Sequence, residues 1–105
     1  MNLYEILVPT VRFGRPVHTR HHRVWDRRVR AIAGGLTILT PANGQWVSNN
    51  GTLLVERMIP VRIACTREQI EKIADLTAAH YCQEAVMFYC LSNEVEIKHY
   101  VNDRS

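Results

Sequence analysis

The chain has 105 residues, of which 47% are hydrophobic and 22% are charged. This composition is that of a globular protein, and it excludes an intrinsically disordered chain, which would be poor in hydrophobic residues and rich in charge. We predict one domain over residues 1–105, because a chain of this length supports a single hydrophobic core.

The net charge of +3 is unevenly distributed. Residues 1–52 hold seven arginines against two acids, whereas residues 53–105 hold six basic residues against eight acids. The longest uninterrupted apolar run, residues 85–91, is too short for the roughly 20 residues of a membrane-spanning helix. The first residues do not resemble a secretory signal. We therefore expect a cytoplasmic protein without a membrane partner.

The three cysteines have no C-x-x-C spacing. An odd number of cysteines without that spacing suits neither a disulfide framework nor a zinc ribbon. We expect reduced thiols, with no metal and no cofactor.

The first half of the chain predicts a strand, a helix and short strands. Residues 2–11 are β-branched and aliphatic, which favours a strand. Helical spacing of apolar residues from position 17 onward, centred on Trp25, predicts a helix that ends at Gly34-Gly35. Residues 36–40 and 45–48 predict two short strands, joined by a turn that contains Asn-Gly.

The second half begins with a long strand. Residues 52–65 alternate with period two, and we expect a bulge or an unpaired stretch at Pro60, which has no N–H. Thr66 to Gln69 match a capping box that begins a second helix. Residues 84–91 are almost wholly apolar and predict a central strand covered on both faces, and residues 94–101 alternate as an edge strand does.

This order of elements predicts an α+β domain of the ferredoxin-like type. In that fold a βαββαβ chain forms an antiparallel sheet with two helices on one face, and here an extra C-terminal strand follows. The other face of the sheet stays uncovered, and apolar or aromatic side chains project there: Leu54, Met58, Met87 and Tyr89. An exposed apolar face commonly marks an interface, so we expect a homo-oligomer, a closed trimer or a dimer.

A basic segment from Arg12 to Arg30 is the densest polar feature. Its candidate ligand-binding residues are Arg20, His22 and Arg23, because guanidinium groups suit carboxylates and phosphates. The alternative is a solvated basic helix face. His18 and His22 have the i, i+4 spacing of some zinc ligands, but no acidic or sulfur ligand stands at a matching position.

Glu56 is the candidate catalytic carboxylate. It lies opposite the aliphatic positions of the long strand, between Leu54 and Met58 in period two. In a partly desolvated interface such a carboxylate binds a cation or shifts its proton affinity, and Tyr4 and Tyr89 are candidates to supply hydroxyl groups there. The alternative is a structural acid paired with an arginine such as Arg62. No nucleophile elbow, P-loop, G-x-G-x-x-G or HExxH motif is present, so the sequence leaves open whether the protein is an enzyme.

Two resemblances add to these predictions. Gly35-Leu36-Thr37, Gly44-Gln45-Trp46, Gly51, Glu56 and Gln83-Glu84-Ala85-Val86 resemble the pattern of an uncharacterised bacterial ferredoxin-like family, which implies no function.

The layout is also similar to that of the phage S-adenosylmethionine lyases. The similarity rests on Tyr4, His22-Arg23, Glu56, Val61-Arg62-Ile63 and the strand from Val86 to Tyr89. It implies a PII-like trimer that holds its ligand between subunits, with Glu56 facing the sulfonium or its amino-acid end and Tyr4 or Tyr89 nearby.

The sequence therefore favours a small oligomeric domain that binds an anionic small molecule, such as a metabolite or nucleotide, in clefts between subunits. In this hypothesis the arginines of the first helix and Glu56 are its polar anchors. One alternative is an S-adenosylmethionine lyase. The other is a module that binds nucleic acid or a protein partner through the basic helix.

Overall fold

The fold is taken from a computed structural model of the chain, which describes residues 1–101. The elements follow in the order β1 (Asn2–Pro9), β2 (Val11–Arg12), β3 (Arg15–Pro16), α1 (Thr19–Ala33), β4 (Thr37–Ile38), β5 (Ala42–Val47), β6 (Leu53–Cys65), α2 (Arg67–Tyr81) and β7 (Phe88–Ser92). The main sheet has the order β4-β6-β1-β7, and β5 pairs with β6 beyond β4. Every pairing is antiparallel.

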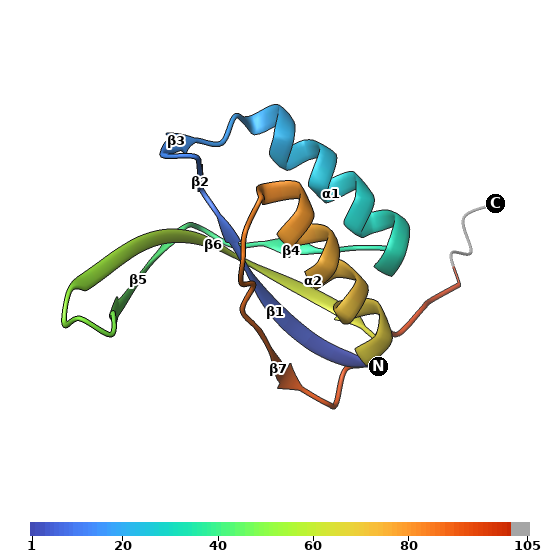
Figure 1. The fold of residues 1–105 in the computed structure, drawn as a ribbon. Coiled ribbons are helices and arrows are strands. Elements are labelled where there is room, and N and C mark those ends of the chain that lie inside the picture. Colours follow the sequence, from blue (N-terminus) through green and yellow to red (C-terminus); the bar gives the residue numbers. More distant parts are fainter. Residues whose placement is uncertain (102–105) are drawn as a thin grey trace.

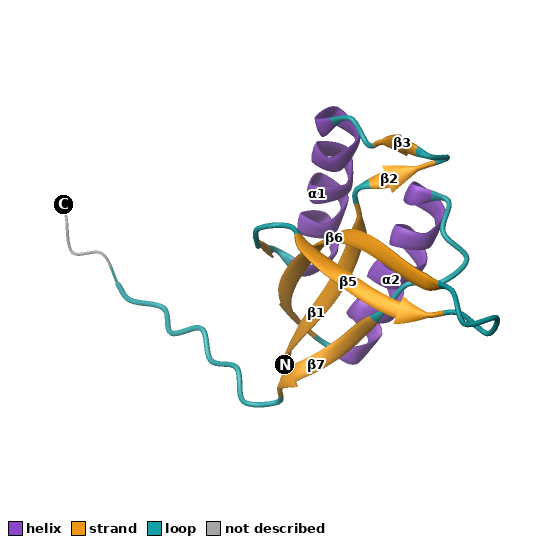
Figure 2. Cartoon of the chain, turned by 90° about the vertical axis from the view of Figure 1, so that its left-hand side faces the viewer, coloured by secondary structure: helices purple, strands orange, loops and turns teal. Residues whose placement is uncertain are grey.

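Both helices cover the same face of the sheet (Figure 1), and in Figure 2 the strands lie in front of α2. This arrangement confirms the predicted ferredoxin-like α+β fold. The other face of the sheet is uncovered within the described chain.

The core lies between the helices and the two central strands. Alternate side chains of β1 and β6 point toward the helices, as the period of two requires. The buried hydrophobic residues are Tyr4, Ile6, Val8, Trp25, Val29, Val61, Ile63, Cys65, Ile70, Ile73 and Tyr81. Trp25 is the central residue that α1 contributes to this core, as the sequence predicts.

The helix boundaries follow from their caps. Helix α1 ends at Gly34, whose φ of 88° is left-handed and costs a glycine little. Helix α2 begins at the predicted capping box, in which the Thr66 hydroxyl accepts from the Gln69 N–H and the Gln69 side chain accepts from the Thr66 N–H.

The strand predictions around Pro60 need one correction. The register between β1 and β6 runs unbroken through Leu7 and Pro60, so no bulge occurs on that side. On the other edge of β6 the partner changes from β4 to β5, and the Pro60 carbonyl accepts from the N–H of Leu39 between them. The missing N–H of Pro60 therefore faces the edge at which the ladder is interrupted.

The two C-terminal strand predictions need correction: the first holds only at its end, and the second is wrong. Residues 84–87 are not a strand, and β7 begins only at Phe88 and lies at the sheet edge instead of its centre. The apolar residues 85–87 belong to a connecting segment that lines a groove, and not to a strand covered on both faces. Residues 94–101 form no strand, and this segment leaves the body of the molecule (Figure 2).

A buried hydrogen-bond chain joins the helices. The Trp25 indole N–H donates to the Thr77 hydroxyl over 3.0 Å, and that hydroxyl donates to the Ile73 carbonyl over 2.6 Å. Trp25 is 1% exposed and Thr77 is not exposed. Because water cannot replace the acceptor of the indole N–H, the hydroxyl fixes the approach of α1 to α2.

The first prediction concerns this hydroxyl. Thr77→Val keeps the side-chain shape and leaves the indole N–H without its acceptor, so the free energy of unfolding measured in urea should fall by about 1–3 kcal/mol. Thr77→Ser is the matched control, because it keeps the hydroxyl and loses about one methyl group, which costs about 0.8 kcal/mol. A valine variant as stable as the parent would contradict this role.

Candidate functional site

The uncovered face carries a projecting hairpin. Strands β5 and β6 pair from Ala42 opposite Met58 to Val47 opposite Leu53. The turn closes where the Ser48 N–H donates to the Thr52 carbonyl over 2.9 Å, and Gly51 supplies the left-handed residue with a φ of 83°. The hairpin extends away from the body, at the left of Figure 1.

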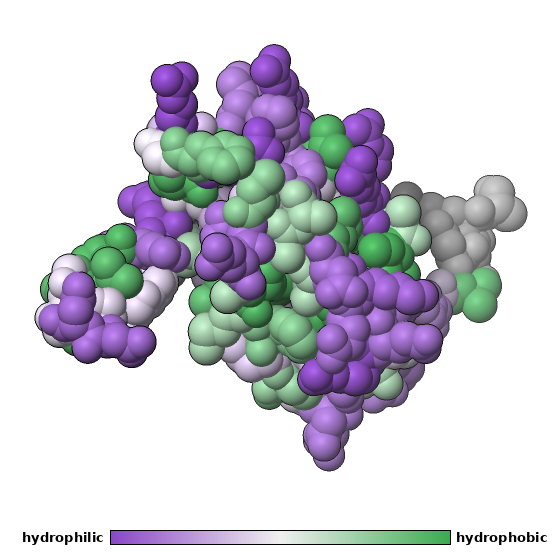
Figure 3. All heavy atoms as spheres, viewed as in Figure 1, coloured by the Kyte–Doolittle hydropathy of each residue, from purple (hydrophilic) through white to green (hydrophobic). Residues whose placement is uncertain are grey.

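A groove of about 1130 Å³ lies between this hairpin and the segment that joins α2 to β7. Figure 3 shows the hollow, with hydrophobic side chains on the body beside the hairpin. Its base is formed by Leu7, Met58 and Pro60. Its walls are formed by Ala42, Asn43, Gly44, Trp46 and Glu56 of the hairpin, by residues 82–87 of the connecting segment and by Phe88 of β7.

The groove combines an apolar lining with two carboxylates. These belong to Glu56 of the hairpin and Glu84 of the connecting segment, and none of the described residues that line the groove is basic. A carboxylate beside apolar surface is less well solvated than in water, and a cation or hydrogen-bond donor offsets that loss. The lining therefore favours a ligand that brings a positive charge.

An indole ring lies across from Glu56. Gly44 pairs directly with Glu56, and a Cβ built on Gly44 would lie only 3.0 Å from Cζ3 of Trp46. The ring therefore packs over the glycine and uses the space that any side chain at position 44 would fill. An aromatic face next to a carboxylate is a suitable surface for a cation or a flat ring.

Glu56 has no ion-pair partner among residues 1–101. The expected structural partner, Arg62, instead contacts Glu5 with its Nε 3.1 Å from Oε1. Glu56 is exposed and borders both the groove and a smaller hollow next to β2. Within one chain, the structural alternative for Glu56 therefore lacks the partner that it requires.

Tyr89 lies on the uncovered face, but its hydroxyl already forms a hydrogen bond with Glu5. Glu5 pairs with Tyr89 across β1 and β7, and the Tyr89 hydroxyl donates to Oε2 of Glu5. Glu5 is only 8% exposed and is satisfied by Tyr89 and Arg62 together. The hydrogen bond to Glu5, with burial, raises the pKa of Tyr89, so this phenol keeps its proton.

Tyr4 lies on the opposite side of the sheet. It pairs with Ile63, faces the helices and is 2% exposed. Its hydroxyl accepts from the side-chain amide of Asn2 over 3.0 Å. The structure therefore does not bring Tyr4 and Glu56 together within one chain, although both were candidates for one site.

The three candidates of α1 also lie outside the groove. Arg20 and Arg23 are exposed on the helix, and none of the three lines the groove. Nδ1 of His22 lies 2.6 Å from the Tyr81 hydroxyl. Burial lowers the pKa of His22, partly offset by Asp26, and burial raises the pKa of Tyr81. His22 thus belongs to the contact between the helices.

Residues 1–101 contain neither a cluster of metal ligands nor a membrane-spanning helix. No three His, Cys, Asp or Glu side chains in that range are grouped so that they could hold a metal ion. Nδ1 of His18 accepts from the N–H of Arg20 as a helix cap. No described helix has the length and apolar character needed to cross a membrane.

Gly44, Trp46 and Glu84 are among the members of the groove that sequence reasoning did not assign to a site. A usable signal existed for two of them. Gly44 and Trp46 stand two apart, so both lie on one face of a strand. Pairing of that strand with residues 53–58 places them across from Glu56. Glu84 could not be found in this way, because it was assigned to a strand that begins only at Phe88.

Comparisons with known proteins support the fold. Neither a protein-family model nor a curated protein sequence matches the chain, so the resemblance to an uncharacterised family gains no support. Among solved structures, the divalent cation tolerance protein CutA1 from Thermus thermophilus superposes with a TM-score of 0.67 at 12% identity, over 90% of this chain and 86% of that one.

Two further neighbours agree with this result. The periplasmic divalent cation tolerance protein CutA from Archaeoglobus fulgidus superposes with a TM-score of 0.67 at 13% identity, over 92% of this chain and 87% of that one. A phage S-adenosylmethionine lyase in complex with S-methyl-5'-thioadenosine has a TM-score of 0.61 at 15% identity, over 86% and 79%. At these identities the neighbours show the ferredoxin-like, PII-like fold and nothing about activity.

The second prediction concerns His22. Its lowered pKa means that the unfolded chain takes up a proton near pH 6.5 while the folded chain resists it. The free energy of unfolding should therefore fall as the pH is lowered from 7 toward 5, and His22→Gln should make this fall smaller. His99→Gln, at an exposed position, should leave the pH profile unchanged. An equal fall in the His22 variant would contradict the assignment.

Proposed function

We propose that the chain is a homo-oligomeric binding protein whose groove holds a small molecule with a cationic centre and a flat apolar part. The observation that carries this proposal is the composition of the groove: two carboxylates, an indole ring and no basic residue among its lining. The ligand class differs from the anionic one that the basic helix favours in the sequence, because the arginines of α1 do not reach the groove of their own chain.

The electrostatic part of the proposal rests on Glu56. Its carboxylate has no ion-pair partner in the described chain and stands across from Gly44, over which the Trp46 ring packs. A ligand cation placed there forms a charge-assisted contact with the Glu56 carboxylate. This contact is stronger beside apolar surface than in bulk water. Glu84 on the opposite wall adds to the same negative potential.

The apolar part of the proposal rests on Trp46. The indole is 43% exposed and borders the groove. A ligand ring stacked on the indole would remove both surfaces from water and add a cation–π contribution where the charge lies close to the ring. S-Adenosylmethionine has both features, a sulfonium and a purine, and belongs to the proposed class.

A second candidate function is that of an S-adenosylmethionine lyase. It is favoured by the same pairing of a carboxylate and an aromatic ring, and one neighbour of similar fold is such a lyase with a thioadenosine bound. An intramolecular elimination depends mainly on positioning and charge placement. In this candidate Glu56 holds the sulfonium or its amino-acid end, whereas Tyr89 does not line the groove and donates to Glu5 within the same chain.

Assembly of several copies is proposed from the hairpin. Its side chains are apolar on both faces, and the exposed ones include Trp46, Val47, Leu53, Leu54 and Val55. A two-stranded ribbon of this kind is marginally stable without cover, and a second copy of the chain would supply that cover.

We also propose the cytoplasm as the compartment of the protein, since Cys65, Cys82 and Cys90 are free thiols.

The third prediction tests the ligand class. S-Adenosylmethionine should raise the melting temperature of the protein, whereas S-adenosylhomocysteine, which lacks the sulfonium charge, should raise it less. A ligand present at a hundredfold excess over its Kd adds about 2.7 kcal/mol to the free energy of unfolding. Glu56→Gln should abolish the difference between the two ligands, because it removes the charge and keeps the shape.

Glu96→Gln is the matched control, at an exposed position outside the groove. Equal stabilisation of the parent by both ligands would contradict a cationic site. Release of methylthioadenosine from S-adenosylmethionine by the parent, and its loss in Glu56→Gln, would distinguish the lyase from a binding protein.

The fourth prediction tests assembly. Light scattering at micromolar concentration should give the parent a mass that is a multiple of 12.1 kDa. Leu53→Lys should reduce that mass, because it places a charge in the proposed contact. Ala79→Lys on the exposed side of α2 should not. A parent that is monomeric under these conditions would overturn the oligomer.

A further inference from the structure

Helix α1 carries a row of arginines on its outer face. Arg20, Arg23, Arg27 and Arg30 are all exposed and have the spacing i, i+3, i+7 and i+10. This spacing places them within one side of a helix, opposite the buried Trp25 and Val29. We call these four residues the arginine row. It is roughly 15 Å long, given the rise of a helix.

The arginine row forms no ion pair within the described chain. Both ion pairs of residues 1–101 involve other arginines, Arg62 and Arg67. The first turn of α1 contains no acidic residue, although acids are favoured at the positive end of a helix dipole and cations are not. Like charges at these spacings also destabilise a helix. Such departures from local rules are expected where a function requires them.

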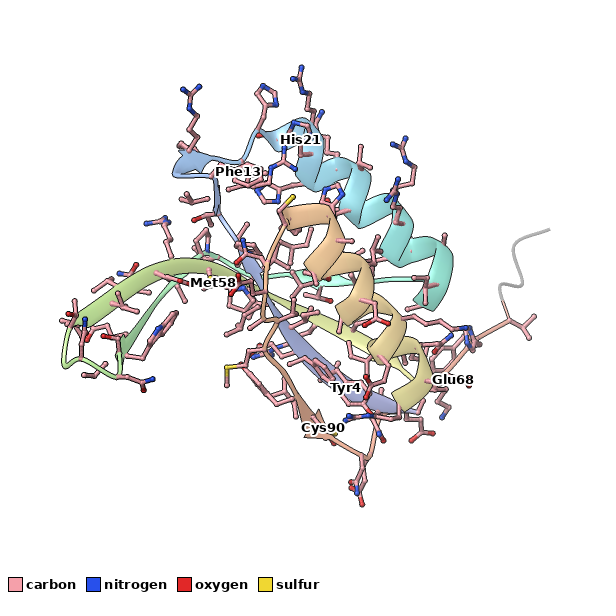
Figure 4. The ribbon with its side chains drawn as sticks, viewed as in Figure 1. Tyr4, Phe13, His21, Met58, Glu68 and Cys90 are labelled. Atoms are coloured by element: carbon pink, nitrogen blue, oxygen red, sulfur yellow. The ribbon has the colours of Figure 1, made fainter. Side chains whose placement is uncertain are left out.

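A second, independent feature lies at the start of α1. Strands β2 and β3 pair Arg12 with Arg15, and the two-residue turn between them is Phe13-Gly14. Phe13 has a φ of 53° and is 80% exposed. A left-handed φ is unfavourable for a phenylalanine, and exposure of its ring to water is unfavourable as well. Figure 4 shows Phe13 at this tip, near His21.

The tip is held against both helices. The Arg12 guanidinium donates to the His80 carbonyl over 3.1 Å, and Nε2 of His80 donates to the His21 carbonyl over 2.8 Å. The Arg12 guanidinium also lies 5.9 Å from the centre of the Phe13 ring. The tip that carries the aromatic ring is therefore held in a fixed position at the N-terminal end of α1.

We infer that the arginine row and Phe13 form a binding surface for single-stranded nucleic acid. The guanidinium groups contact successive phosphates, and the Phe13 ring stacks on one base. Phe13 borders the smaller hollow next to β2. The arginine row borders neither that hollow nor the groove, and Phe13 does not line the groove. The inference therefore goes beyond the proposed function and stands or fails apart from it.

Two other polyanions fit these observations less well. Duplex nucleic acid keeps its base faces stacked inside, so Phe13 would have no ring to contact, whereas an exposed aromatic beside basic residues is how proteins bind single strands. A membrane-surface helix inserts an apolar face into lipid. The apolar face of α1 is buried in the core by Trp25 and Val29, so it has nothing to insert.

The experiment measures fluorescence anisotropy of a labelled oligothymidine or oligouridine of about 12 nucleotides, a length within the range of single-strand sites. The parent should bind it, and log Kd should rise linearly with log salt between about 50 and 200 mM KCl. Arg23→Gln and Arg27→Gln should each weaken binding and reduce the magnitude of the salt slope by about 0.7, since each removes one phosphate contact.

Phe13→Ala should weaken binding between about fivefold and a hundredfold and leave the salt slope unchanged, because stacking releases no counterions. Arg67→Gln on α2 is the matched control, because Arg67 already pairs with Glu71 over 2.6 Å; its affinity and slope should equal those of the parent. Thermal melts should show that every variant is folded, since all the substituted side chains are exposed.

Three results would overturn the inference. The first is no binding at the lowest salt concentration. The second is binding that the arginine-row variants or Phe13→Ala leave unchanged. The third is equally tight binding of a duplex of the same length or of vesicles that contain anionic lipid.

Discussion

The alternation of side chains along β1 and β6 is the constraint on which the rest of the structure depends. Because Tyr4, Ile6 and Val8 face the helices, the residues between them must face the other side of the sheet. Glu5 is one of these, and its carboxylate is buried there only because Arg62 and Tyr89 satisfy it. A shift of one residue in this register would exchange the two sets completely. The hydrophobic core and the polar cluster on the uncovered face are thus consequences of one pairing.

The groove depends on what happens at the far edge of β6. The two residues of β4 pair with Arg62 and Val61, and β5 takes over at Met58. Pro60 lies between these partners and cannot donate to either, so the outer ladder breaks at this point. Beyond the break, β5 and the first part of β6 continue as a ribbon without helices above it (Figure 1). This ribbon forms one wall of the groove and exposes its apolar side chains.

The sequence allowed prediction of those features that are fixed by neighbouring residues. The capping box at Thr66, the glycine stop of α1 and the alternation of β6 are local patterns; the structure confirms the first two, and it confirms the alternation over residues 61–65 but not over residues 53–57, which are all exposed. Residues 84–91 failed because an apolar run indicates burial without indicating what provides it: part of the run lines the groove as a connecting segment, and only its end is a strand. The partners of Glu5 depend on strand register across the sheet, which spacing within one strand cannot give.

The uneven charge of the sequence corresponds to two surfaces that select opposite ligands. The groove has carboxylates and no basic residue in its lining, so it disfavours phosphates. The outer face of α1 has arginines without ion-pair partners among the described residues, so it disfavours cations. A single anionic ligand held by both Glu56 and the arginines of α1, as the sequence suggested, would need them side by side, and one chain does not place them so. Only an oligomer in which α1 of one copy approaches the groove of another would unite them. Within a single chain the two surfaces therefore act independently.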